Sequence, residues 1–257
     1  MFNYMPHSGF TYHIPLKVYY EGFGEVTPGE YVELGQVGAF QYAFGLKSAF
    51  EKSGIASYQN PESLGYSPIP SNAANTFVAN HDTERRGNTL NVDSPNNMYT
   101  LAHILMLAHP WGTPTVFSSY QFNNTDQGAP NGNYGTCSGN NGQGGWYCQH
   151  RWTPISGMVG FRNAVQTNGM KNWFSPTPQR VAFGRGGAGF VVINNLDQGW
   201  NSSFQTSLPA GKYCNVIDGI KKGGICSGTT VTVASNGQFT FDVGKRDAVA
   251  IHINAKL

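Results

Sequence analysis

The chain has 257 residues, of which 12% are charged, and its formal net charge is +2. This balance excludes the strongly basic surface of a nucleic-acid-binding protein and the acidic tail of some interaction segments. No apolar run approaches the roughly 20 residues of a membrane-spanning helix, so no membrane partner is expected. The length suits one large domain or two modest ones.

The first two thirds of the chain alternate between short β-rich runs and helical patterns. Strand and helix alternating at this spacing predict βα units around a parallel sheet. The expected strands are 17–20, 75–80 and 113–120; residues 37–53 begin as a strand and end as a helix before Gly54; and the expected helices are 96–109 and 149–165.

After Asn168 the pattern changes to short β runs separated by Gly, Asn and Asp, with no helical pattern of useful length. Short strands punctuated in this way predict an antiparallel sandwich. We therefore divide the chain into residues 1–168 and 169–257. The β runs that carry this prediction are 181–183, 189–193, 231–233 and 248–253.

The four cysteines form two pairs that are close in sequence, which predicts the disulfides Cys137–Cys148 and Cys214–Cys226. Disulfides indicate an oxidising compartment, so an extracellular location is expected. No Cys-x-x-Cys spacing is present, which argues against zinc. The first nine residues lack the basic start and apolar stretch of a signal peptide, so we expect part of a longer sequence upstream of Met1.

Two predicted strands end in carboxylates. Asn80 is followed by His81 and Asp82, and the strand that ends at Tyr20 is followed at once by Glu21. In a parallel βα barrel, polar residues at the carboxyl ends of strands face the active site. A carboxyl beside apolar and aromatic neighbours can have a raised pKa and serve as a general acid. The alternatives are that Asp82 caps the next helix and that Glu21 is a solvated loop residue.

Several segments in chain order carry a further signal. In the first part they are residues 77–87, 105–120, 148–152 and 158–163, and near the C-terminus they are 181–186, 208–214 and 250–253. Together they resemble the α-amylase family, in particular its animal-type members and related microbial ones. The resemblance runs from about residue 17 to residue 257 and implies roughly strands 5–8 of a (β/α)8 TIM barrel followed by an antiparallel β-sandwich.

The resemblance implies a retaining glycoside hydrolase that acts on the α-1,4 bonds of starch or glycogen. It gives Asp82 the role of transition-state stabiliser, His81 that of a hydroxyl-binding neighbour, and Glu21 that of general acid, with Glu25 as a second candidate. The family's nucleophile, an Asp on the fourth strand, has no counterpart, because residues 1–16 contain neither Asp nor Glu. We therefore expect impaired catalysis.

The resemblance also implies a structural calcium, although most of its ligands would lie upstream of Met1. Chloride activation is not expected, because Gln121 stands where chloride-activated relatives carry Arg. The expected partner is an α-glucan, and the family is monomeric, although half a barrel leaves open sheet edges that favour self-association. Two alternatives remain open: a non-catalytic remnant that binds glucans, and an α-glucan transglycosylase.

Overall fold

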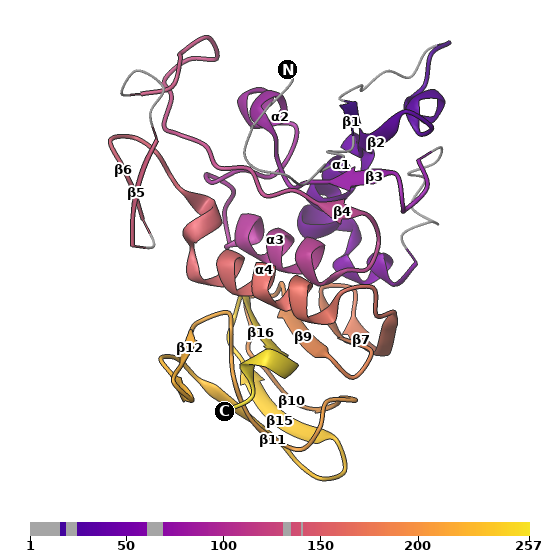
Figure 1. Ribbon diagram of the computed structural model, residues 1–257, viewed down its shortest axis with the longest axis vertical. Helices are drawn as coiled ribbons and strands as arrows, with labels where there is room; N and C mark the ends of the chain where they lie inside the picture. Colours follow the sequence, from indigo (N-terminus) through magenta and orange to yellow (C-terminus); the bar gives the residue numbers. More distant parts are fainter. Residues whose placement is uncertain (1–15, 19–24, 61–68, 131–134, 140) are drawn as a thin grey trace, which may run out of the picture.

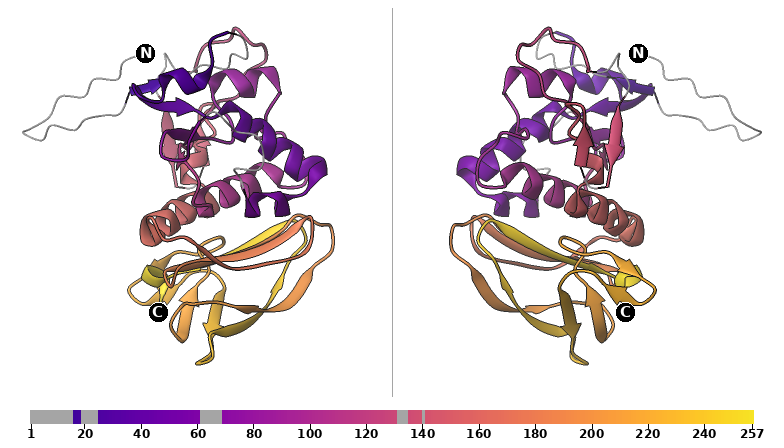
Figure 2. Two further views of the ribbon diagram at one scale, coloured as in Figure 1. Left: turned by 90° about the vertical axis from the view of Figure 1, so that its right-hand side faces the viewer. Right: turned by 90° about the vertical axis from the view of Figure 1, so that its left-hand side faces the viewer.

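The computed structural model describes residues 16–18, 25–60, 69–130, 135–139 and 141–257. Figure 1 shows a part built on parallel strands, which contains the earlier residues, and a part built on antiparallel strands, which contains the later ones. Helices α3 (Met98–Ala108) and α4 (Thr153–Val165) lie between the two parts, as both views in Figure 2 also show. Among the helices described, none is long and apolar enough to cross a membrane.

The parallel sheet has the strand order β1-β2-β3-β4, and every neighbouring pair is parallel. A strand order that follows chain order, with helical segments between the strands, is the arrangement of consecutive βα units in a barrel. The predicted parallel part is therefore confirmed. The strands are short: β1 (Leu16–Val18), β2 (Gly35–Gly38), β3 (Ala74–Thr76) and β4 (Thr113–Pro114).

Two strands are shorter than the sequence predicts. The strand expected over 75–80 ends at Thr76, and residues 77–80 lead into α2 (His81–Arg86). The strand expected over 113–120 ends at Pro114, although the Thr115 amide still donates to Thr76 O at 2.8 Å. Beyond that point the chain leaves the sheet and bonds to residues 145–149 instead, so its β-rich composition does not produce a long strand.

Helix α1 (Phe40–Ser48) follows β2 as predicted and continues as a π-helical turn (Ala49–Ser53) that ends at Gly54. Gly54 has a φ of 98°, a conformation that residues with side chains rarely adopt. The helix expected over 149–165 is split into a 3₁₀ helix (Gln149–Arg151) and α4. Pro154 lies in the first turn of α4, where its missing N–H costs no hydrogen bond, and it therefore favours a new helix start.

The antiparallel part contains a four-stranded sheet with the order β16-β9-β8-β7 and three strand pairs, β10–β15, β11–β14 and β12–β13. The four β runs expected from the sequence lie in β8, β9, β14 and β16, so the antiparallel character is confirmed. Strands β10 and β15 were not predicted, because exposed polar residues alternate with buried ones along them and leave no apolar run. The bounds are β7 (Met170–Thr177), β8 (Arg180–Arg185), β9 (Gly189–Asn194), β10 (Trp200–Gln205), β11 (Gly211–Cys214), β12 (Lys221–Lys222), β13 (Ile225–Cys226), β14 (Thr230–Val233), β15 (Gln238–Val243) and β16 (Asp247–His252).

Helix α4 ends at Val165 and β7 begins at Met170. We propose that the boundary between residues 1–168 and 169–257 falls in this short link.

Both predicted disulfides are confirmed. The Cα atoms of Cys137 and Cys148 are 5.9 Å apart, and those of Cys214 and Cys226 are 5.2 Å apart. The first bridge ties the hairpin of β5 (Thr136–Ser138) and β6 (Asn141–Gln143) to the start of the 3₁₀ helix Gln149–Arg151. The second ties β11 to β13.

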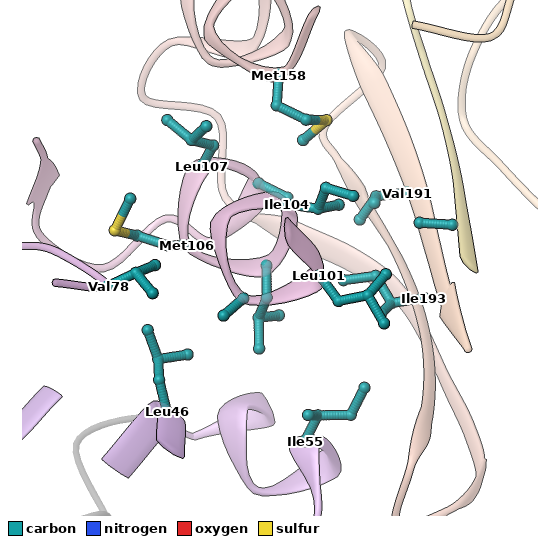
Figure 3. Packing of buried hydrophobic residues seen from close by; sticks show 14 of the residues in the cluster. Leu46, Ile55, Val78, Leu101, Ile104, Met106, Leu107, Met158, Val191 and Ile193 are labelled. Atoms are coloured by element: carbon teal, nitrogen blue, oxygen red, sulfur yellow. The ribbon is translucent and has the colours of Figure 1, made fainter. Parts of the chain in front are cut away.

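A hydrophobic core spans both parts of the molecule. Ten of the eleven residues of α3 are buried, so this helix is covered on all sides rather than on one face. In Figure 3, Leu101 and Ile104 of α3 lie beside Val191 and Ile193 of β9, while Val78 lies on the opposite side of the helix. The C-terminal strands therefore cover one side of a helix that belongs to the parallel part. A second cluster lies within the antiparallel part and includes Phe190, Trp200, Phe204, Tyr213 and Phe239.

Two arginines bond to backbone carbonyls near the ends of α3 and α4, and one of them, Arg185, comes from the antiparallel part. Arg185 of β8 is 1% exposed and donates to Ala108 O at 2.6 Å, Gln166 O at 2.8 Å and Asn168 O at 2.5 Å. Arg162 of α4 donates to His109 O and to Gly112 O. The last carbonyls of a helix have no partner inside the helix, so these guanidinium groups satisfy the ends of α3 and α4.

Candidate functional site

The candidate site lies where the parallel strands end. The carboxyl ends of β3 and β4 lead to α2 and to residues 115–127, respectively. Glu21 follows β1 but lies outside the described residues, so its predicted approach to Asp82 stays a prediction. Glu25 is described and exposed; it precedes a 3₁₀ helix (Pro28–Tyr31).

Asn80 fixes the start of α2. Its side-chain Oδ1 accepts from the amides of Asp82 and Thr83, at 2.9 Å each, and the Thr83 hydroxyl accepts from the Asn80 amide at 3.0 Å. This reciprocal capping is worth about 1 kcal/mol in a typical helix. The capping role considered for Asp82 therefore belongs to Asn80.

His81 and Asp82 follow the cap, and their side chains face solvent. Their side chains are 67% and 52% exposed, and His81 Nε2 lies 3.6 Å from Asp82 Oδ2. Both side chains offer hydrogen-bonding atoms to a ligand that approaches the carboxyl ends of the strands. A sugar, with hydroxyls that donate and accept, matches this pair.

The next turn of α2 faces inward. Glu84 is 6% exposed, and its Oε2 accepts a hydrogen bond from the Ser119 hydroxyl. The Ser119 amide in turn donates to Gln149 Oε1 at 2.8 Å. Burial raises the pKa of the Glu84 carboxyl, while the Ser119 hydrogen bond and the nearby Arg85 act in the opposite direction.

Arg85 extends sideways along the same segment. Its guanidinium donates to the Tyr120 hydroxyl, to Gln127 O at 2.9 Å and to Thr125 O. It also lies over two rings, 5.5 Å from the centroid of Tyr120 and 5.0 Å from that of Phe122. Sequence reasoning missed both Glu84 and Arg85, because their partners lie 35 to 42 residues away and follow no short spacing.

Metal ligation has little support in the part of the chain that is described. There, no group of three or more His, Cys, Asp or Glu side chains is arranged to hold an ion. The calcium implied by resemblance therefore does not fit these residues alone. At Gln121, the residue relevant to chloride, the backbone amide donates to Gly145 O at 2.7 Å.

Comparison with known proteins gives a consistent result. Residues 173–254 match the family described as "Alpha amylase, C-terminal all-beta domain". An α-amylase of Streptomyces violaceus is 42% identical over 237 residues, which cover 91% of this chain and 39% of that protein. An α-amylase of Tribolium castaneum is 41% identical over 250 residues, which cover 90% of this chain and 49% of that protein. The chain thus spans half or less of the length of these curated relatives.

Solved structures of α-amylases also resemble this chain. The crystal structure of α-amylase I from Eisenia fetida matches with a TM-score of 0.80 at 32% identity, covering 92% of this chain and 53% of the other. A mutant of the same amylase in complex with maltohexaose matches equally well. A γ-CGTase of an alkalophilic Bacillus clarkii matches with a TM-score of 0.59 at 16% identity, a likeness of fold alone.

Proposed function

Because this chain is related to the α-amylases and corresponds to the C-terminal half of their length, we propose that it serves an α-amylase-type glycoside hydrolase acting on α-1,4-glucans. The observation that carries the proposal is the similarity along nine tenths of the chain, with His81 and Asp82 exposed together at the carboxyl ends of the strands. The retaining course of the reaction belongs to the same proposal.

Each candidate residue has a distinct role in that reaction. Asp82 accepts hydrogen bonds from glucose hydroxyls and stabilises positive charge on the distorted sugar ring, and His81 binds a neighbouring hydroxyl. Glu21, with Glu25 as second candidate, protonates the oxygen of the leaving sugar. No Asp or Glu occurs in residues 1–16 to act as nucleophile, so this polypeptide on its own lacks the group that traps the sugar.

The remaining expectations are also proposals. The two disulfides support an extracellular location. We propose that calcium, where the enzyme uses it, is held mainly by residues outside this chain, and that Gln121 does not support chloride binding. An open parallel sheet supports self-association of this chain, through β1 or β4 at its edges.

Binding and hydrolysis separate the proposal from its alternatives. The purified chain is titrated with maltohexaose by calorimetry and assayed for reducing sugar released from soluble starch. The variants are Asp82→Asn and, as a matched control, Asp242→Asn, which alters an exposed carboxylate in β15 of the antiparallel part. Loss of a charged hydrogen bond of about 1.5–3 kcal/mol predicts roughly 10- to 150-fold weaker binding for Asp82→Asn.

The outcomes are distinct. Binding without hydrolysis, weakened only by Asp82→Asn, supports the site and indicates a chain that binds glucan without cleaving it. Transfer of glucosyl units to a second maltohexaose, detected by chromatography of the products, would favour the transglycosylase. No binding by the unsubstituted chain, or equal binding by both variants, would remove Asp82 from the site.

A further inference from the structure

The geometry points to Glu84 and Arg85 as positioning residues that clamp residues 118–127, here called the rim segment, onto α2 and so hold His81 and Asp82 in place. The importance of His81 and Asp82 rests on the function proposed above. The clamp itself rests on contacts between described residues.

Helix α2 cannot hold its own position. It has six residues, whereas isolated helices shorter than about 12–15 residues are marginal in water. Its first two side chains are largely exposed. Beyond the cap by Asn80, the orientation of His81 and Asp82 depends on what the following residues contact.

Glu84 supplies the inner half of the clamp. Its carboxylate accepts from the Ser119 hydroxyl in a buried setting, where a charge-assisted hydrogen bond is stronger than at the surface. Ser119 is itself fixed from two sides, because its amide donates to Gln149 Oε1 and its carbonyl accepts from the Tyr147 amide at 2.9 Å. Through Ser119, the helix is joined to the 3₁₀ helix Gln149–Arg151 and to the disulfide at Cys148.

Arg85 supplies the outer half. One guanidinium reaches two backbone carbonyls and one hydroxyl of the rim segment, and it stacks over two of the segment's rings. The Tyr120 hydroxyl also donates to Gln127 O at 3.1 Å, which closes the contacts into a ring. Lysine cannot reproduce this set, because its ammonium lacks the planar fork that serves several acceptors at once.

The two halves act on consecutive residues of one helical turn. The Glu84 contact sets how closely α2 lies to Ser119, and the Arg85 contacts set the rotation of α2 about its own axis. Since His81 and Asp82 lie one turn earlier on the same helix, both contacts set where their polar atoms point. Neither Glu84 nor Arg85 needs to touch a ligand to affect binding.

The test uses the full chain and four variants: Arg85→Ala, Arg85→Lys, Glu84→Ala and Glu84→Gln. Arg151→Ala serves as the control, because Arg151 is exposed and its Nε donates to Gly139 O, away from α2. The first measurement is hydrogen exchange of the Thr83 and Glu84 amides, together with the NMR signals of the His81 ring. The second is the dissociation constant for maltohexaose.

Arg85→Ala and Glu84→Ala should speed exchange of both amides by about tenfold or more, shift the His81 ring signals and weaken maltohexaose binding by about tenfold, for a loss near 1.4 kcal/mol. Glu84→Gln should lie much closer to the unsubstituted chain than Glu84→Ala does, because the amide oxygen still accepts from Ser119 but without the charge. Arg85→Lys should give values between those of Arg85→Ala and those of the unsubstituted chain. Arg151→Ala should change nothing at α2.

Rescue by glutamine separates positioning from general destabilisation. If Arg85→Ala and Glu84→Ala leave the exchange rates and the His81 signals unchanged, the clamp does not exist. If exchange and signals change while maltohexaose affinity does not, α2 is held as described but its position is irrelevant to glucan, and the positioning role is overturned. If the unsubstituted chain fails to bind maltohexaose, the proposed function fails, and the exchange measurement still decides whether the clamp exists.

Discussion

Replacing Arg185 with methionine should weaken the contact between the two parts of the molecule and lower the free energy of unfolding. The substitution keeps an unbranched side chain of similar length but removes every donor that reaches Ala108 O, Gln166 O and Asn168 O. These carbonyls lie where the ends of α3 and α4 meet β8, and a buried acceptor left without a donor costs about 1–3 kcal/mol.

An opposing effect reduces the loss. Burial, together with the smaller effect of the neighbouring Arg162, lowers the pKa of Arg185 to about 10, so the folded chain bears a cost for holding this charge. At neutral pH the group is still protonated, and methionine removes that cost. Three orphaned carbonyls outweigh one relieved charge, and we expect the free energy of unfolding to fall by about 3 kcal/mol.

Urea unfolding followed by far-ultraviolet circular dichroism and tryptophan fluorescence measures the change. The control is Arg180→Met on the same strand, where the guanidinium also bonds to backbone carbonyls but is more exposed. Water replaces its hydrogen bonds, so the control should lose about 1 kcal/mol or less. If Arg185→Met unfolds within 0.5 kcal/mol of the control, an error margin typical of such comparisons, the capping of α3 and α4 by this residue does not stabilise the fold.

Three further predictions follow from the same structure. Replacing Cys214 and Cys226 by serine should cost about 3 kcal/mol, because the bridge closes a loop with a sequence separation of 12; urea unfolding measures it, and no loss would show that the loop closes equally well without the bond. Burial lowers the pKa of both His103 and His109 to about 4, so as pH falls these histidines take up protons in the unfolded chain before they do so in the folded one. The stability from this difference is fully present above about pH 6.5 and is lost progressively down to about pH 4. The loss is on the order of 3 kcal/mol for each histidine. Unfolding measured across that window should be less pH-dependent in His109→Gln than in the unsubstituted chain; equal slopes would refute the assignment. Finally, the chain should release little reducing sugar from soluble starch, and robust release abolished by Glu21→Gln would show that another carboxylate acts as nucleophile.

The sequence predicts those features of the fold that depend on local pattern. Strands β8, β9 and β16 are apolar runs, α3 has an apolar composition with a proline just beyond its end, and each disulfide joins cysteines 11 or 12 residues apart. Strand length depends instead on which hydrogen-bond partners the folded structure places beside a segment. Residues 115–120 have strand-like composition, yet Ser119 and Tyr120 bond to α2 and to the segment before Cys148.

The candidate site divides in the same way. His81 and Asp82 were found because they follow a β run directly, and Asn80 could have been recognised as the cap from its type and from Thr83 three residues later. Glu84 and Arg85 could not have been found by spacing. A carboxylate and a guanidinium inside a short polar helix look like solvated residues until Ser119 and Gln127 are brought beside them by the fold.

The burial of ten of the eleven residues of α3 bears on how this protein could be altered by recombination. A segment that is exchanged between relatives must bring its own packing surface with it, and the strands from β7 onward share theirs with α3 and α4. A crossover placed in the link after Val165 would set Val191 and Ile193 from one parent against Leu101 and Ile104 from the other. A crossover before Met98 would keep those contacts within one parent, but it would set Val78 of one parent against α3 of the other, so α3 ties the segments before and after it to the same parent.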